Sequence, residues 1–435
     1  MGFRIFWFRR DLRLDDNHGL FQALCSDEKV IPVFIFDPKI LNKLPKNDAR
    51  VNFIHKALSN INKQLNKVNS SIGIYHGNPI DIFKELIAKF PISDVYTNHD
   101  YEPYSIKRDQ EVELLLKQNN IHFKSYKDQV IFEKNEITKD DTKPYVVYTP
   151  YFNKWYSKFL DSEISHFPSE NKMNHFHKNE SLPFLTLSDI GFNPSEISVP
   201  EYCISNKIID EYEEFRNFPS IDKTSKTGIY SRFGLISIRK LVVKANKSDN
   251  KTFLKELVWR EFFMQILWHF PHTVDSSFKA KYEAIPWINN QDQFQKWRTG
   301  QTGYPIVDAG MRELNQTGFM HNRVRMLVAS FLCKHLLIDW KWGERYFAEK
   351  LLDFELSSNI GNWQWASGSG VDAAPYFRIF NPTEQTKRFD KNFVYINKWV
   401  PELNDLNYPD PIVDHKTARQ RCLTTYKHAL DNYKN

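Results

Sequence analysis

The chain has 435 residues, of which 41% are hydrophobic and 26% charged. This composition is typical of a globular protein with two domains or slightly more. The sequence contains no apolar run of about 18 residues, the length that would predict a transmembrane helix. Its N-terminal segment also lacks the features of a signal peptide, so we expect a cytoplasmic protein. The formal net charge of +6 permits a phosphate-bearing partner without requiring one.

Aromatic residues make up 15% of the chain, and nine of the eleven tryptophans lie between Trp259 and Trp399. Such a cluster fits either core packing or a flat ligand such as a base or a flavin. The four cysteines are spaced for neither a zinc site nor a small disulfide scaffold, and we expect free thiols and no metal.

The first 125 residues alternate between strand and helix patterns. Strand-like runs cover residues 3–8, 30–36, 71–76, 94–97 and 121–125, and helical patterns cover 48–67, 79–89 and 104–118. This alternation predicts an α/β domain with a doubly wound, five-stranded parallel sheet. The first strand is not followed by the Gly-x-Gly-x-x-Gly pattern, so an ordinary dinucleotide fold is not supported.

The rest of the chain predicts a linker and a larger all-helical domain. We expect the α/β domain at 1–130, an interdomain linker at 131–205 and the helical domain at 206–435. Helical patterns cover 206–217, 234–246, 251–268, 303–316, 321–338 and 342–352. The glycine-rich segment 359–370 is expected to interrupt the helices.

Four residues recur at helical spacing and share one face: Glu256, Trp259, Arg260 and Phe263. A carboxylate, an indole and a guanidinium on one face can hydrogen-bond a base edge, stack on it and hold an anion. The alternative is a surface ion pair of Glu256 with Arg260 beside a half-buried tryptophan.

Further along, Asn322, Arg325 and Met326 also share a helix face. Asp353 and Glu355 lie two residues apart, a spacing that suggests a metal site. No pair of histidines accompanies them, so a metal is not favoured.

Six short motifs, taken in their order, make the chain resemble the photolyase/cryptochrome flavoprotein family over nearly its whole length. It is most similar to the class I cyclobutane pyrimidine dimer photolyases of microbes. The motifs are FWFRRDLR at 6–13, WREF at 259–262, TGYP at 302–305, MHNR at 320–323, NIGNWQW at 359–365 and DAAPYFR at 372–378.

The resemblance implies an FAD buried in the helical domain and active when reduced. Asp353 and Arg325 match an ion pair beside the flavin ring, and Asn359 matches the position facing flavin N5. Glu355 stands where aspartate is usual, and Gly228 replaces a hydroxyl residue of the phosphate-binding segment. The implied FAD-binding residues are Tyr212, Thr224, Ser225, Lys226, Thr227, Gly228, Phe253, Arg260, Asn322, Arg325, Asp353, Phe354, Glu355 and Asn359.

The family's activity is light-dependent repair of pyrimidine dimers in UV-damaged DNA, by an electron passed from excited reduced FAD to the flipped-out dimer. Glu256 would hydrogen-bond the dimer. Trp363, Trp340 and Trp287 match the chain of tryptophans that reduces oxidised flavin, with core packing as the alternative role. The implied DNA contacts are Arg216, Glu256, Trp259, Arg260, Phe263, Asn322, Arg323, Met326, Trp365 and Gln385.

The resemblance also implies a monomer without membrane contact, associated with the nucleoid in a bacterium. Two other functions remain open. A blue-light receptor usually carries a long C-terminal tail, and this chain ends about 54 residues after Pro382. A (6-4) photolyase resembles a His-His pair where this chain has His321-Asn322.

The sequence also bears on a second, antenna chromophore. Tyr104-Ser105 replaces the Asn-Glu pair that holds folate in this family, which disfavours methenyltetrahydrofolate. Arg50, Asp100 and Glu102 fit a deazaflavin or FMN instead. The alternative is that these are ordinary loop charges over an empty cleft.

Overall fold

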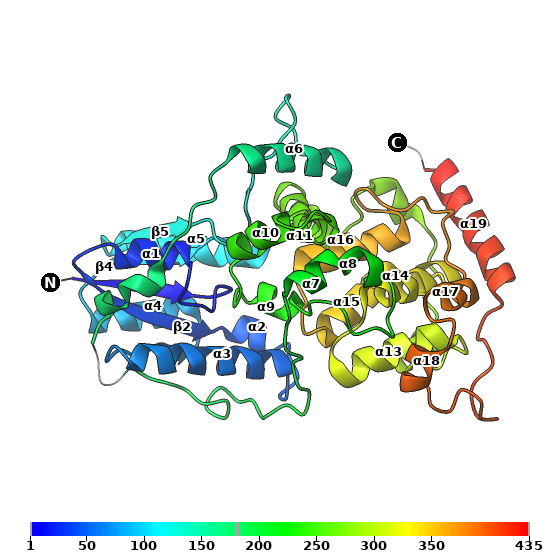
Figure 1. Ribbon diagram of the computed structural model, residues 1–435, viewed down its shortest axis with the longest axis horizontal. Coiled ribbons are helices and arrows are strands. Elements are labelled where there is room, and N and C mark those ends of the chain that lie inside the picture. Colours follow the sequence, from blue (N-terminus) through cyan, green and yellow to red (C-terminus); the bar gives the residue numbers. More distant parts are fainter. Residues whose placement is uncertain (1, 179–181, 434–435) are drawn as a thin grey trace. The chain divides into compact units, whose positions relative to one another are not determined.

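The computed structural model describes residues 2–178 and 182–433, which fold into two compact units. The α/β unit contains Met1–Glu136, Trp155–Pro200 and Thr227–Lys247, and the helical unit contains Ile137–Lys154, Glu201–Lys226 and Ser248–Asn435 (Figure 1). These limits do not coincide with the expected boundaries at residues 130 and 205, because the segment expected as a linker is divided between the two units.

The α/β unit is built on a five-stranded parallel sheet in the order β3-β2-β1-β4-β5. The order reverses direction beside β1, as in a doubly wound sheet, so the fold class predicted from the sequence is confirmed. The strands are β1 (Phe3–Phe8), β2 (Lys29–Phe36), β3 (Gly73–His76), β4 (Ile92–Asn98) and β5 (His122–Tyr126).

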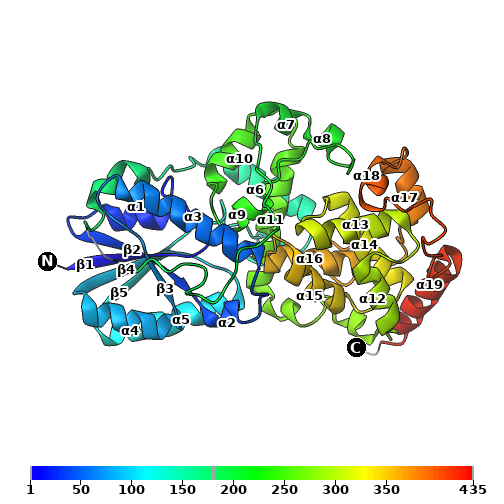
Figure 2. The ribbon, with the colours of Figure 1, turned by 90° about the horizontal axis from the view of Figure 1, so that it is seen from below.

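Both faces of the sheet are covered by helices (Figure 2). On one side lie α1 (His18–Leu24) and α3 (Ala49–Asn66), and on the other α4 (Pro79–Lys89) and α5 (Pro103–Gln118). In β1, Phe6 and Phe8 face α1 and α3, whereas Ile5 and Trp7 face α4 and α5. Burial on both faces explains why this strand is almost continuously hydrophobic.

The helices of this unit are mostly those that the periodicity predicts, with additional short ones. The elements are α1 (His18–Leu24), α2 (Pro38–Leu41), α3 (Ala49–Asn66), α4 (Pro79–Lys89), α5 (Pro103–Gln118), η1 (Ser169–His175), α9 (Gly228–Arg232) and α10 (Ile238–Asn246). Helix α6 (Tyr148–Asp161) begins in the helical unit and continues into the α/β unit.

The named elements of the helical unit are all helices among the residues described. They are α7 (Asn206–Asp210), α8 (Tyr212–Phe215), α11 (Thr252–His269), η2 (Pro271–Val274), η3 (Ala280–Ala284), α12 (Gln291–Thr299), α13 (Pro305–Thr317), α14 (Asn322–Ser330), η4 (Phe331–His335), α15 (Trp340–Lys350), α16 (Leu356–Ser367), α17 (Pro382–Phe389), α18 (Val394–Trp399) and α19 (His415–Asp431).

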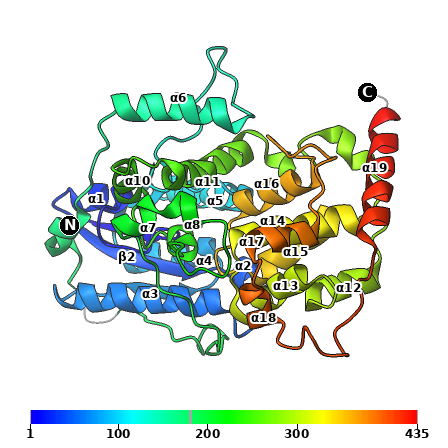
Figure 3. The same cartoon turned by 45° about the vertical axis from the view of Figure 1, so that its right-hand side comes forward.

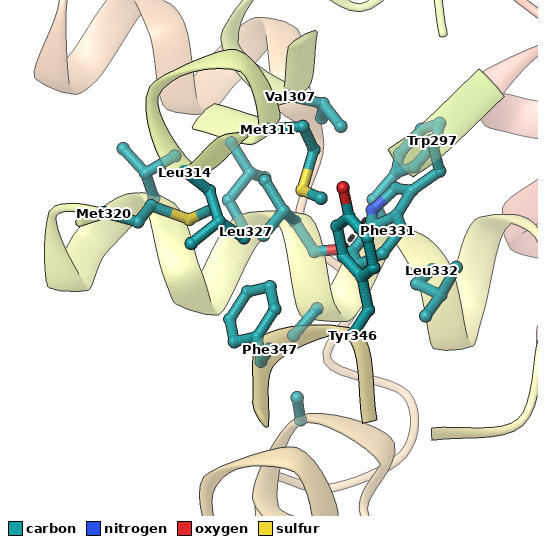
Figure 4. Close-up of a cluster of buried hydrophobic side chains, with 14 of the residues drawn as sticks. Trp297, Val307, Met311, Leu314, Met320, Leu327, Phe331, Leu332, Tyr346 and Phe347 are labelled. Carbon is teal, nitrogen blue, oxygen red and sulfur yellow. Dashed lines mark hydrogen bonds between the residues drawn. The ribbon is translucent and has the colours of Figure 1, made fainter. Parts of the chain in front are cut away.

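The core of this unit is centred on Trp297, which is fully buried among Met311, Phe331 and Tyr346 (Figure 4). Its indole Nε1 donates a hydrogen bond to the Val328 carbonyl oxygen at 3.1 Å. A buried tryptophan of this kind satisfies its one polar atom while contributing a large apolar surface.

The prediction that the glycine-rich segment 359–370 interrupts the helices is wrong, because α16 runs from Leu356 to Ser367. Gly361 is required for close packing: a Cβ there would lie 2.2 Å from Cδ1 of Phe263 on α11. Gly368, at a φ of 95°, ends the helix in the left-handed conformation. The glycines therefore mark a tight helix contact and a helix end.

Within residues 2–178 and 182–433, no helix is both long and apolar enough to span a membrane.

Candidate active site

A pocket in the helical unit opens between α14, the C-terminal part of α15 and α16. It brings together nine of the residues predicted from the sequence. Its lining consists of Asn322, Arg325, Met326, Ala329, Phe347, Leu351, Asp353, Phe354, Glu355, Ser358, Asn359, Asn362, Trp363, Trp365 and Ala366. Asn322, Arg325 and Met326 lie on the same wall, as their helical spacing predicts.

One wall of the pocket carries the predicted ion pair between Arg325 and Asp353. The contact is bidentate, with Nη1 3.1 Å from Oδ1 and Nη2 3.0 Å from Oδ2. Arg325 Nε also donates to the Met320 carbonyl oxygen at 2.7 Å. With three donors engaged, the guanidinium is a fixed cation at the pocket wall.

Glu355 links the start of α16 to α11. Its carboxylate lies 3.3 Å from Nε of Arg260 and accepts a hydrogen bond from Ser358 Oγ at 3.2 Å. Arg260 therefore pairs across to Glu355, and Glu256 pairs with Arg216, with Nη1 2.6 Å from Oε1. The alternative surface pair of Glu256 with Arg260 is replaced by these two longer-range contacts.

Asn359 is held by a residue that the sequence analysis did not single out, Glu344 on α15. The Asn359 Nδ2 donates to both Oε1 and the backbone oxygen of Glu344, at 2.8 and 3.0 Å. Burial raises the pKa of the Glu344 carboxyl, and the hydrogen bond from Asn359 opposes that rise. The amide group thus has a fixed orientation at the pocket wall.

Trp259 and Phe263 have different environments although they share a helix face. The Trp259 ring is partly exposed and stacks on Tyr148, with ring centroids 3.7 Å apart and an interplanar angle of 9°. Phe263 is only 5% exposed and packs against Gly361. Its ring belongs to the interior, in contrast to the expected DNA contact.

The arginines predicted to contact the DNA backbone lie in a cluster of positive charge. Arg323 Nη2 donates to Asn217 Oδ1, and its guanidinium lies 4.5 Å from the ring centroid of Phe389. Burial and the charges of Arg216, Arg388 and Arg378 lower the pKa of Arg323.

Two members of this cluster, Arg378 and Arg388, were not selected from the sequence. Arg378 lies in one of the family motifs, and that position was its only signal in the sequence. Gln385, which was selected, lies three residues before Arg388 on α17 and therefore shares its face.

The remaining residues predicted to bind FAD lie on two parts of the chain. Tyr212 contacts the buried Phe253 edge-on, with centroids 5.2 Å apart, and burial raises the pKa of Tyr212 to about 12. In the helical unit, Lys226 Nζ lies 2.8 Å from an Asp222 carboxylate oxygen.

The predicted phosphate-binding segment divides at this point. Thr224, Ser225 and Lys226 belong to the helical unit, while Thr227 and Gly228 begin α9 in the α/β unit. Lys226 has a φ of 53°, a left-handed conformation that is uncommon for a lysine.

The three tryptophans of the predicted electron chain all lie in the helical unit. Trp363 is buried against Phe347, with centroids 4.9 Å apart, and against Gly343 on α15. Trp340 is buried one turn before Gly343 on the same helix, and Trp287 is partly buried beside Tyr426, with centroids 6.0 Å apart.

The residues expected at an antenna site are engaged in ion pairs within the α/β unit. Arg10 Nη1 lies 3.2 Å from Asp100 and 3.0 Å from Glu102, and Arg50 lies 2.6 Å from Asp48. Burial opposes ionisation of Asp100, but the neighbouring arginines outweigh it and lower its pKa. Arg10 and Asp100 follow β1 and β4, where ligands bind in doubly wound sheets.

Two family models match the chain in succession. One, described as DNA photolyase, covers residues 4–171, and one described as the FAD binding domain of DNA photolyase covers residues 253–407. A deoxyribodipyrimidine photo-lyase of Synechococcus sp. is 34% identical, over 97% of this chain and 96% of its own length. The chain belongs to the DNA photolyase family.

Solved structures of photolyases have the same fold. A class III photolyase from Agrobacterium tumefaciens superposes with a TM-score of 0.88 at 31% identity, over 99% of this chain and 98% of its own. A photolyase from Sulfolobus tokodaii, described with two FAD molecules, has a TM-score of 0.82 at 32% identity, over 98% of this chain and 99% of its own. The family expected from the motifs is confirmed, while the class I assignment stays a prediction.

Proposed function

We propose that the protein repairs cyclobutane pyrimidine dimers in DNA under light, with FAD held in the pocket of the helical unit. The observation that carries this proposal is the composition of that one pocket. It combines the Arg325–Asp353 pair and Asn359 with Asn322 and Trp365, the residues implied for cofactor and lesion.

The pocket residues fit the chemistry of a flavin. The Arg325 guanidinium stabilises negative charge on a bound ring, Glu355 and Ser358 offer oxygen ligands, and the fixed Asn359 amide presents a polar group to a ring edge. When bound in its reduced form, FAD supplies the photoexcited electron that splits the dimer. The chain's own contribution is to bind the ring, orient it and hold the substrate beside it.

We assign binding of the lesion to partly exposed aromatic side chains and to Asn322. A dimer must leave the base stack at a cost of a few kcal/mol, less at a damaged site. Stacking on an aromatic ring returns about 1–3 kcal/mol per base. Trp365 and Trp259 are both partly exposed and therefore suited to this. Asn322 offers an exposed amide in the pocket that Trp365 also lines.

We assign binding of the DNA backbone to the cluster of Arg216, Arg323, Arg378 and Arg388. Phosphate contacts position DNA without reading its sequence. We assign Arg216 a second role: its ion pair with Glu256 fixes the direction of that carboxylate.

A second chromophore in the α/β unit would be of deazaflavin or FMN type. The Sulfolobus tokodaii photolyase with two FAD molecules supports a flavin-like ligand for this family. Here the ion pairs of Arg10 and Arg50 must rearrange or contact the ligand from their present positions. Reconstitution with FMN, a deazaflavin and methenyltetrahydrofolate, followed by energy transfer to FAD, tests this assignment.

Repair is tested with purified FAD-loaded protein and a thymine dimer in an oligonucleotide. Dimers should disappear under near-UV or blue light when the flavin is reduced and persist in the dark. Asn322→Ala should weaken binding of the damaged site, because an amide contact to the lesion is lost. Asn60→Ala, at an exposed asparagine of α3, serves as the control. Equal loss in the dark, or none under light, overturns the proposal.

A further inference from the structure

Phe393 is an exposed aromatic residue that the functions proposed above do not use. It precedes α18 and is 40% exposed, and the next residue, Val394, is 57% exposed. Phe393 is the N-cap of α18 and Val394 its first residue, so two exposed apolar side chains follow each other where the helix begins. Apolar side chains at a surface are common when scattered singly, and two in succession form a small exposed apolar surface.

The backbone of Phe393 is in an unfavourable conformation. Its φ of 57° and ψ of 25° are left-handed values, which a bulky L-residue adopts rarely and glycine adopts freely. The turn is fixed by Asp390, whose backbone oxygen accepts from Phe393 N at 2.9 Å and whose carboxylate accepts from Tyr395 N and Ile396 N at 3.0 Å each. A strained conformation held this firmly points to a use for the side chain.

The surroundings of this turn are basic. Lys387, Arg388 and Lys391 are all exposed and precede Phe393 by two to six residues. Arg388 belongs to the arginine cluster around Arg323, whose neighbour in sequence, Asn322, lines the pocket.

The turn before α18 is packed on the same group of helices as that cluster. Both α17 and α18 contact α13, which in turn contacts α14 (Figure 3). Tyr395 on α18 donates a 2.6 Å hydrogen bond to Glu313 of α13, so the turn is anchored to the helix beside α14.

We propose that Phe393 is a DNA contact outside the lesion pocket, with its ring against a sugar or base of the strand whose phosphates Arg323 and Arg388 hold. The occupant is nucleic acid because exposed cations closely precede the two exposed apolar residues, and a DNA strand presents both phosphate charge and flat apolar faces. This inference rests on the proposed function and adds an apolar contact beside the arginine cluster.

Because the backbone of Phe393 is strained, removal of its side chain should affect stability and DNA affinity differently. Phe393→Gly relieves the left-handed conformation, so the melting temperature should not fall. The loss of the ring should weaken binding of dimer-containing DNA roughly 5-fold or more. A residue with a purely structural role would show the opposite pattern, with lower stability and unchanged affinity.

Salt dependence separates the ring from the charges. In Phe393→Gly, the slope of log affinity against log salt should equal that of the unmodified protein, because no phosphate contact is lost. In Arg388→Ala the slope should fall by about 0.9, the value for one phosphate. An altered slope in the glycine variant overturns the proposal.

Two further variants and one control complete the experiment. Phe393→Asn keeps a residue that tolerates the left-handed region and should bind as weakly as the glycine variant, while Phe393→Trp should retain affinity. Leu114→Ala, which removes a 62% exposed side chain from the α/β unit, should leave binding unchanged.

The reference measurement separates this inference from the proposed function. If the unmodified protein binds and repairs damaged DNA but Phe393→Gly binds equally well, the inference fails alone. If the unmodified protein neither binds nor repairs it, the proposed function fails.

Discussion

The Asn359 amide nitrogen donates to both the carboxylate and the backbone oxygen of Glu344, so this one residue determines which way the amide faces. No motif includes Glu344, and its sequence signal is only a glutamate within an amphipathic helix. Asn359 itself was accessible to sequence reasoning because it lies in a family motif, whereas its partner comes from a different helix.

We predict that Asn359→Asp creates a pair of carboxyl groups that share one proton. The new carboxylate would lie about 3 Å from that of Glu344, whose pKa burial already raises, and two such groups cannot both ionise cheaply. The shared proton gives the pair a pKa in the folded state that is higher than in the unfolded chain. The unfolded chain therefore releases this proton first, and the free energy of unfolding falls as the pH rises above about 4. Urea unfolding at pH 5 and pH 8 should show an additional loss of about 1–3 kcal/mol at the higher pH.

The double variant Asn359→Asp with Glu344→Gln is the control for this pair. It leaves only one ionisable carboxyl, so the additional pH dependence should disappear. If the double variant keeps it, the coupling does not involve Glu344.

At the scale of elements, the strands and long helices of the α/β unit follow from sequence periodicity because burial on each face imposes it. Helix α16 did not follow, because the packing of Gly361 against Phe263 is a tertiary contact that overrides the low helix propensity of glycine. Short helices such as α1 were missed because seven residues give too little periodicity, although Asn17 supplies an N-cap.

Helix α19 is joined to the core by a histidine pair that predicts acid sensitivity. His335 Nε2 lies 2.8 Å from His415 Nδ1, and burial, with the charges of His415, Arg421 and Lys334, lowers the pKa of His335 to about 3. The unfolded chain, with a histidine pKa of about 6.5, binds this proton first, so stability falls as pH drops from about 6.5 towards 3.

His335→Gln should remove a pH-dependent loss of roughly 2 kcal/mol between pH 7 and pH 5. The change with pH is the informative quantity, because the substitution also alters packing at every pH. Urea unfolding and hydrogen exchange of α19 amides at both pH values measure it. His428→Gln, at an exposed position of the same helix, should keep the full dependence; a shared loss in both variants would contradict the assignment to His335.

At the scale of the whole molecule, the sequence predicts an α/β unit and a helical unit, but it does not predict which segments of the chain belong to each. Residues 155–200 belong to the α/β unit and 137–154 to the helical unit, so the boundary is discontinuous. Composition alone cannot reveal this, because the loop-rich segments that cross between the units resemble a linker in their content of serine, proline and asparagine.

Substitution of Trp363 should separate two uses of light that this molecule would combine, reduction of the cofactor and repair of DNA. Trp363 lines the pocket and contacts α15 through Gly343, one turn from the buried Trp340. If these indoles carry electrons inward, Trp363→Phe should strongly slow light-driven reduction of oxidised FAD. Repair by protein whose FAD was reduced chemically should persist, because that reaction needs no electron from the tryptophans. Trp297→Phe is the matched control: Trp297 is also buried and its ring centroid lies 6.2 Å from that of Trp363. Both variants lose an indole from one core and should lose comparable stability, so a defect in reduction confined to Trp363→Phe reports the electron path, and normal reduction in that variant rules the path out.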